Sequence, residues 1–307
     1  MRENNMELYE SKILSLVKEN EKIVVLTAEN RVSLRNVPEK LNQNFIDVGI
    51  SEQNLIGIGA GLAKLGFLPI MHGMSTFLTM RAFEFIRTDL GYPKLPSILV
   101  GTFNGLSATA NGTANGPTHQ AIEDIALMKL VPNMTVVAPS DRLETLQILD
   151  NISKLEGPLY IRDSNFESME IEREPFVWGK NDCIVKGDEI AILSFGTMLD
   201  ICLKASKKLS EKSISHAVYN MRFLKPIDKN LLNEIFSKFE KIIVVEDHID
   251  TGGLSSIIRE FAWENGKDKK IIFMNLRDSF FRPGNFNDAI QNTELTVGKI
   301  IAKVINS

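Results

Sequence analysis

Short runs of β-branched and apolar residues alternate with helical patterns along almost the whole chain. In the helical segments, apolar residues recur at intervals of three and four. This alternation is typical of a parallel sheet wrapped by helices, so we expect an α/β fold. In the first half, strands are expected at 23–27, 45–50, 68–72, 97–101, 135–139 and 158–162, and helices at 6–19, 51–66, 76–90, 119–130 and 142–155.

The pattern is interrupted between residues 165 and 182 by charged residues and a proline. A chain of 307 residues is about twice the usual domain length, which predicts two domains. We place the first domain at 1–168, a linker at 169–182 and a second, smaller α/β domain at 183–307. There, strands are expected at 189–196, 216–221, 241–247 and 270–275, and helices at 199–212, 228–239, 252–265 and 295–305.

Composition narrows the classes of function. Hydrophobic residues make up 44% and charged residues 24%, and no long uncharged apolar run is present, so no membrane span is expected. A net charge of -4 argues against nucleic-acid binding. The two cysteines, Cys183 and Cys202, and the lack of a secretory pattern predict a cytoplasmic protein. The four histidines are far apart, so no metal site made by this chain alone is expected.

Gly57, Gly59 and Gly61 could suggest a dinucleotide-binding loop. That motif needs its glycines in the turn directly after a strand, whereas six residues separate the expected strand from Gly57. The glycines are therefore expected inside a helix, where they permit close packing.

Glu52 follows the expected strand 45–50 and lies at the start of the next helix. Ligands of parallel sheets bind at the carboxyl ends of the strands, which makes Glu52 a candidate site residue. The alternative is structural, with Ser51 as the N-cap and Glu52 complementing the helix dipole.

A polar, glycine-rich loop connects the strand at 97–101 to the helix expected from His119. Long loops of this kind are usually kept for function. A histidine at a helix N-terminus is biased toward its neutral form, which can donate to or accept from a substrate oxygen. As a lone residue, a histidine in this position is more often a structural one bonded to a loop carbonyl.

The order and spacing of three segments carry a family resemblance: FIDVGISEQNLIGIGAGLAKLGF, STFLTMRAFEFIRTDL and GPTHQAIEDIALMKLVPNMTVVAPSD. Together they resemble the pyrimidine-binding domain of transketolases and deoxyxylulose-phosphate synthase, over about residues 1–165. The second half is similar to the C-terminal domain of the same family, through FGTMLDICLKA, FLKPID and VVEDHIDTGGLSS.

The resemblance implies thiamine diphosphate as cofactor. Glu52 matches the carboxylate that bonds N1′ of the aminopyrimidine and promotes removal of the thiazolium proton. Phe77 matches the aromatic residue that stacks on the pyrimidine, and Arg81 an arginine near the same ring. His119 matches a histidine that contacts substrate hydroxyls, whereas His248 matches only a structural turn.

Three departures from the family lie on the substrate side. Phe103 stands where the family has a phosphate-binding histidine, and residues 163–165 stand where it has an arginine, with Arg162 just before them. Asn115 replaces an acidic residue in a loop about four residues longer than usual. These changes predict an unusual substrate, with Phe103, Asn115 and Arg162 near it.

The resemblance also implies a split transketolase. The family's N-terminal domain, which binds the diphosphate and its Mg²⁺ or Ca²⁺, has no counterpart here, so we expect it on a partner chain in an α2β2 heterotetramer. The expected reaction is transfer of a two-carbon ketol unit. The alternatives are the β subunit of a 2-oxo acid dehydrogenase, which shares the fold and the glutamate, and a catalytically idle partner protein.

Overall fold

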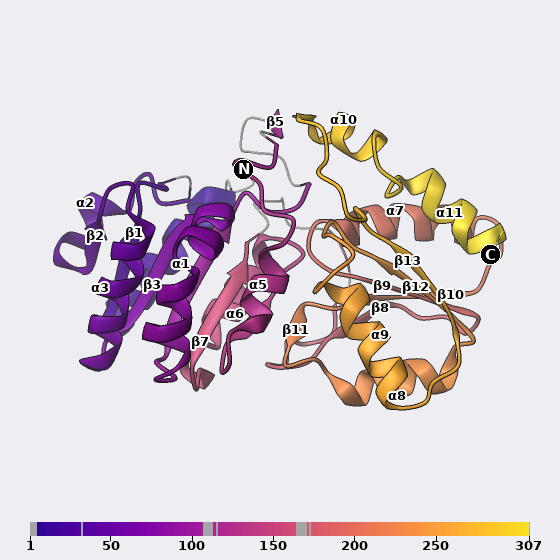
Figure 1. Cartoon of the computed structure of the whole chain (residues 1–307), viewed down its shortest axis with the longest axis horizontal. Coiled ribbons are helices and arrows are strands. Elements are labelled where there is room, and N and C mark those ends of the chain that lie inside the picture. Colours follow the sequence, from indigo (N-terminus) through magenta and orange to yellow (C-terminus); the bar gives the residue numbers. More distant parts are fainter. Residues whose placement is uncertain are drawn as a thin grey trace.

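A computed structural model describes residues 5–31, 33–106, 113–114, 116–163, 171 and 173–306. The chain forms two α/β halves that lie side by side, each with a mainly parallel sheet flanked by helices (Figure 1). The predicted fold class is therefore confirmed.

The sheet of the first half runs through a mostly buried core. Within the described residues it has seven strands in the order β11-β6-β7-β4-β3-β1-β2. All neighbouring pairs are parallel except β11 and β6. The strands are β1 (Ile23–Thr27), β2 (Phe45–Asp47), β3 (Leu68–Met74), β4 (Ser97–Thr102), β6 (Thr135–Val137), β7 (Pro158–Arg162) and β11 (Phe223–Lys225).

Most helices of the first half lie where the apolar spacing predicts them. One exception is the range 76–90, where two π-helical segments flank a single short α-helical one; π-helical turns are rare and are frequent at functional sites. The helices are α1 (Asn5–Glu19), α2 (Pro38–Leu41), η1 (Asn42–Asn44), α3 (Glu52–Lys64), η2 (Phe77–Arg81), α4 (Phe83–Phe85), η3 (Ile86–Gly91), α5 (Asp124–Leu130), α6 (Arg142–Asp150) and η4 (Ile152–Lys154).

The prediction that His119 begins a helix is wrong, because α5 starts five residues later, at Asp124. Residues 117–119 form a turn instead. The backbone of Ala121 pairs with the loop after β4: its N–H donates to Phe103, and its carbonyl accepts from Gly105. These backbone groups are therefore not available for helical hydrogen bonds. Because His119 does not stand at a helix N-terminus, the argument that a helix dipole favours its neutral form no longer applies.

The second half has a smaller sheet, with the strand order β13-β12-β9-β10-β8. Strands β9 to β13 of this sheet are parallel, and β8, which periodicity did not predict, is an antiparallel edge strand. The strands are β8 (Asp182–Val185), β9 (Ile190–Ser194), β10 (His216–Asn220), β12 (Lys241–Val245) and β13 (Lys270–Met274), and the helices are α7 (Met198–Ser210), α8 (Lys229–Lys238), α9 (Leu254–Glu264), α10 (Phe286–Gln291) and α11 (Val297–Asn306).

The two halves are joined by more than the linker. Strand β11 comes from the second half but completes the sheet of the first, and one apolar core contains side chains from α5 together with α8 and α9. Strand β5 (Thr113–Ala114) pairs with β14 (Gly284–Asn285) at the top of Figure 1. The boundary at 169–182 stays a prediction; part of it lies outside the described residues, and β8 begins at Asp182.

None of the helices in these ranges is long and apolar enough to cross a membrane. Both cysteines are free thiols, with Cys202 buried and Cys183 half-buried.

A buried histidine ties α1 to the first sheet. The hydroxyl of Tyr9 lies 2.8 Å from Nε2 of His72, and Nδ1 of His72 lies 3.4 Å from the carbonyl oxygen of Leu26. Burial lowers the pKa of His72 to about 4, because the charged imidazolium loses its hydration. Protonation of this ring therefore opposes folding.

The pH dependence of stability is expected to reflect this histidine. In the unfolded chain His72 binds a proton near pH 6.5, and in the folded chain it does so only near pH 4. The contribution of neutral His72 to stability is therefore full above pH 6.5 and is lost as the pH falls toward 4. Between pH 7 and 5, the wild type should lose about 2 kcal/mol more unfolding free energy than His72→Gln. Urea denaturation at both pH values measures this difference, and equal losses in the two proteins would contradict it.

Candidate active site

Several of the predicted site residues that the structure describes lie at the carboxyl edge of the first sheet. The chain order reverses between β1 and β3, because β2 lies on one side of β1 and β3 and β4 on the other. This is the place where open α/β sheets bind ligands. Glu52 follows β2, Phe77 and Arg81 follow β3, and Phe103 follows β4.

Glu52 is the first residue of α3 and is only 3% exposed. Its Oε2 accepts a hydrogen bond of 2.8 Å from Nη1 of Arg81. Among the described residues, Oε1 accepts none, so one carboxylate oxygen is left for a ligand. The capping alternative loses support, because the hydroxyl of Ser51 donates to the carbonyl of Val48 and makes no cap bond to the helix.

Phe77 connects the two charged residues to His119. The guanidinium carbon of Arg81 lies 4.6 Å from the centroid of the Phe77 ring. The rings of Phe77 and His119 also meet edge to face, with centroids 5.5 Å apart and an interplanar angle of 70°. Glu52, Arg81, Phe77 and His119 thus form one continuous set of contacts, although they come from three separate segments.

His119 is half-buried, and its Nδ1 lies 2.9 Å from the hydroxyl oxygen of Thr118. The turn that carries it begins at Gly116, whose φ of 80° favours glycine. A Cβ at Gly116 would lie 2.7 Å from Cγ of Pro283, so the second half packs directly against this turn.

Phe103 is half-buried in the loop after β4 and has a φ of 57°, which is uncommon for a bulky residue. Its carbonyl oxygen accepts from Ala121, which fixes the loop beside the turn of His119. Asn115 and the longer part of the loop lie outside the described residues.

Arg162 has a role that the sequence did not reveal. It is 2% exposed, and its guanidinium donates to Asp124 of the first half and to Asp247 of the second. This placement argues against the predicted substrate contact, because both carboxylates already engage the side chain. Asp163 is equally buried and accepts from Arg142, while residues 164 and 165 lie outside the described ranges.

Two polar atoms at the same sheet edge were missed by the sequence analysis. Oδ1 of Asn30 and Oγ1 of Thr76 are buried and have no hydrogen-bond partner among the described residues. Nδ2 of Asn30 donates to Oγ1 of Thr102, at the end of β4, which places Asn30 at the edge. In the sequence, the signal that could have identified Asn30 is its position shortly after the strand β1. Buried polar atoms without a hydrogen-bond partner are rare in folded proteins, and a ligand could satisfy these two.

The two remaining candidates are His248 and a metal site, and neither adds a residue to the active site. His248 is buried; its Nδ1 lies 2.9 Å from the carbonyl oxygen of Ile249, and its Nε2 accepts from the N–H of Ala126. In the part of the chain that the structure describes, no three His, Cys, Asp or Glu side chains are placed to hold a metal ion.

The fold and the site define a class of protein: two α/β domains in which an arginine joins a buried glutamate to a phenylalanine at the ligand-binding edge of the first sheet. The chain belongs to the transketolase family. Residues 4–165 match the family described as "Transketolase, pyrimidine binding domain", and residues 179–300 match "Transketolase, C-terminal domain". Domains of this family imply dependence on thiamine diphosphate.

Relatives and solved structures agree with this membership. The chain is 33% identical to a "Putative transketolase C-terminal section" of Methanocaldococcus jannaschii, over 97% of this chain and 93% of that protein. It is also 33% identical to 1-deoxy-D-xylulose-5-phosphate synthase of Dictyoglomus thermophilum, covering 98% of this chain but 48% of the relative. The chain therefore spans about half the length of such synthases.

Among solved structures, one titled "Split gene transketolase, inactive beta4 tetramer" has a TM-score of 0.83 and 32% identity, covering 98% of this chain and 96% of that one. A transketolase of Campylobacter jejuni has a TM-score of 0.77 and 17% identity, covering 99% of this chain and 46% of that one. The second likeness concerns the fold alone.

Proposed function

We propose that this chain is the pyrimidine-binding, C-terminal subunit of a split, thiamine-diphosphate-dependent transketolase that transfers a two-carbon ketol unit from a ketose to an aldehyde. The observation that carries this proposal is the setting of Glu52: it is a buried carboxylate with one oxygen available, and Arg81 links it to the ring of Phe77, which in turn contacts His119. The cytoplasm is the proposed location.

The residues present fit the aminopyrimidine of the cofactor. Glu52 would hold its N1′, and the ring of Phe77 would lie against its face. When bound, thiamine diphosphate supplies the carbon nucleophile and the electron sink for the transferred unit.

The work of this chain is proton transfer and orientation. Glu52 holds and moves a proton at N1′, and its burial keeps competing water away. Arg81 orients the carboxylate through Oε2. His119 is placed by Phe77 and the Thr118 turn to exchange a hydrogen bond with a substrate oxygen.

We propose that an N-terminal transketolase subunit completes the site by binding the diphosphate and Mg²⁺ or Ca²⁺, in an α2β2 assembly with two copies of this chain. Large apolar side chains are exposed close to the site: Ile50, two residues before Glu52, is 72% exposed, and Met80, next to Arg81, is 36% exposed. Leu65 and Tyr92 in the same half are 77% and 87% exposed. We propose that the two apolar side chains next to the site residues in the sequence, Ile50 and Met80, contact the partner chain.

The substrate is proposed to differ from the common pentose phosphates. Phe103 offers no cation, Asp163 is an anion paired with Arg142, and Arg162 is engaged by two carboxylates. An acceptor with an uncharged or bulkier far end suits this site better. Each lost charge-assisted bond to phosphate weakens binding by about 1.5–3 kcal/mol.

Reconstitution tests the proposal. The chain is mixed with its N-terminal partner, thiamine diphosphate and Mg²⁺, and assayed with ketose and 2-oxo acid donors. We expect two-carbon transfer from a ketose, with kcat/KM for xylulose and ribose phosphates below about 10⁴ M⁻¹s⁻¹. Higher values would contradict the substrate argument. Turnover of 2-oxo acids alone would replace the proposal by the dehydrogenase alternative, and no turnover with any donor would favour an idle partner.

A further inference from the structure

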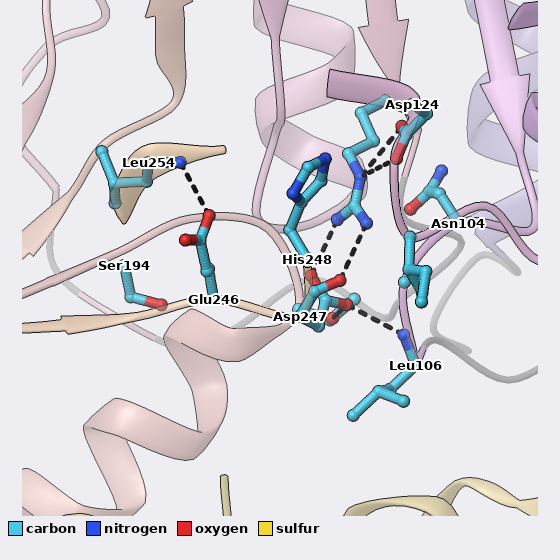
Figure 2. Close-up of polar contacts among 12 residues, drawn as sticks. Asn104, Leu106, Asp124, Ser194, Glu246, Asp247, His248 and Leu254 are labelled. Carbon is cyan, nitrogen blue, oxygen red and sulfur yellow. Dashed lines mark hydrogen bonds and ion pairs between the residues drawn. The ribbon is translucent and has the colours of Figure 1, made fainter. Parts of the chain in front are cut away.

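The second sheet has its own ligand-binding edge, and the first half of the chain fills it. The chain order of this sheet reverses between β9 and β12, because β10 lies on one side of β9 and β12 and β13 on the other. Ser194 ends β9, and Glu246 and Asp247 follow β12 (Figure 2). In open α/β sheets this crevice receives a ligand. Here it receives Arg162 and the loop that contains Leu106.

Asp247 is the centre of this junction and is fully buried. Its Oδ1 accepts from Nη1 of Arg162 at 2.8 Å, and its Oδ2 accepts from the backbone N–H of Leu106 at 3.0 Å (Figure 2). The hydroxyl of Thr197 also donates to Oδ2, at 3.3 Å. A Cβ at Gly105 would lie 1.9 Å from Oδ2, so the loop reaches this carboxylate only because a glycine, with φ of 57°, stands there.

One branch of contacts leads from Asp247 to the segment of Phe77. Nε of Arg162 donates to Oδ2 of Asp124 at 3.0 Å. The hydroxyl oxygen of Tyr160 lies 2.8 Å from the same carboxylate oxygen and 2.9 Å from Oγ of Ser75. Ser75 stands two residues before Phe77 and is fully buried. The whole branch is shielded from water, where hydrogen bonds to charged groups are strongest.

A second branch leads to His119. The N–H of Gly105, next to Leu106, donates to the carbonyl of Ala121 at 2.7 Å. The side-chain amide of Gln120 donates to the carbonyl of Gly105 and accepts from the N–H of Gly116. The turn of His119 is therefore attached on both sides to the loop that Asp247 holds.

We infer that Asp247 is a positioning residue of the active site: it acts from the C-terminal domain, through Arg162 and Leu106, to set Phe77 and His119 against each other. The inference deepens the proposed function and rests on it for the meaning of that contact. A carboxylate is required at position 247 because both of its oxygens must accept hydrogen bonds, one from Arg162 and one from Leu106. In Asp247→Asn, the amide presents a donor either to Arg162 or to Leu106, so one branch must break.

The test compares Asp247→Asn with Asp200→Asn, which removes the same charge from a partly exposed ion pair with Lys204 on α7. Amide exchange in the full chain is expected to rise at least tenfold at 103–106 and 119–122 in Asp247→Asn, but not at 190–194. The NMR signal of the His119 ring, identified by its loss in His119→Gln, should shift with it. Asp200→Asn should match the wild type. In the reconstituted enzyme, kcat should fall about 10²-fold in Asp247→Asn.

The exchange and NMR measurements need no cofactor or partner, so they decide the positioning role even where the proposed reaction fails. If Asp247→Asn does not fold, Thr197→Val is used, since it removes only the hydrogen bond from Thr197 to Oδ2 of Asp247. A smaller rise in amide exchange is then expected in the same two segments. Wild-type exchange at 103–106 and 119–122 and an unmoved His119 signal in the folded variant would overturn the inference.

Discussion

Replacing Glu52 with glutamine is expected to lower kcat of the reconstituted enzyme by about 10³-fold without loss of the fold. The amide has almost the same shape and can still accept from Arg81, but it cannot hold and release a proton at N1′. Because Oε1 makes no hydrogen bond to the described residues, few folding contacts depend on the charge. Proton exchange at the thiazolium carbon, followed by NMR, should slow by a similar factor.

Glu39→Gln is the matched control. Glu39 also lies in the first turn of a helix, α2, but is exposed. Its kcat should remain within about twofold of the wild type, as expected of a surface substitution. A Glu52→Gln enzyme that keeps more than a tenth of wild-type turnover would remove Glu52 from the proton transfer.

The isolated chain is expected to bind thiamine diphosphate at least about 10²-fold more weakly than the complex with its N-terminal partner. The described residues supply the proposed contacts to the pyrimidine, but no group of three His, Cys, Asp or Glu side chains among them is placed to hold a metal ion. Two charge-assisted bonds to the diphosphate, at about 1.5–3 kcal/mol each, already account for that factor. Titration calorimetry of the chain, the partner and their mixture measures the three affinities.

Adding Mg²⁺ to the isolated chain should leave the affinity unchanged, whereas it should raise that of the mixture. Micromolar binding by the isolated chain would contradict the split site. In that case the diphosphate contacts would have to come from this chain, or from a second copy of it.

Most of the longer strands and helices of both halves follow from local sequence, and the reason is periodicity. Runs such as Ile23–Thr27 and Pro158–Arg162 are buried at every position, which is what a near-continuous apolar strand in a parallel sheet requires. The antiparallel strands β8 and β11 were not predicted, because both are short and pair with partners remote in sequence. The helix at His119 was predicted wrongly, because its backbone groups pair with the loop after β4.

The sequence by itself predicted Glu52, Phe77, Arg81 and His119 as site residues, because each follows a strand or a distinctive loop in segments with a family resemblance. Only the tertiary structure decided that Arg81 reaches Glu52 and that Phe77 meets His119. It also decided the role of Arg162, which local sequence could not reveal, because its partners Asp124 and Asp247 come from two domains. Side-chain types and their order are set along the chain, whereas a buried charge finds its partner only when both domains have packed around it.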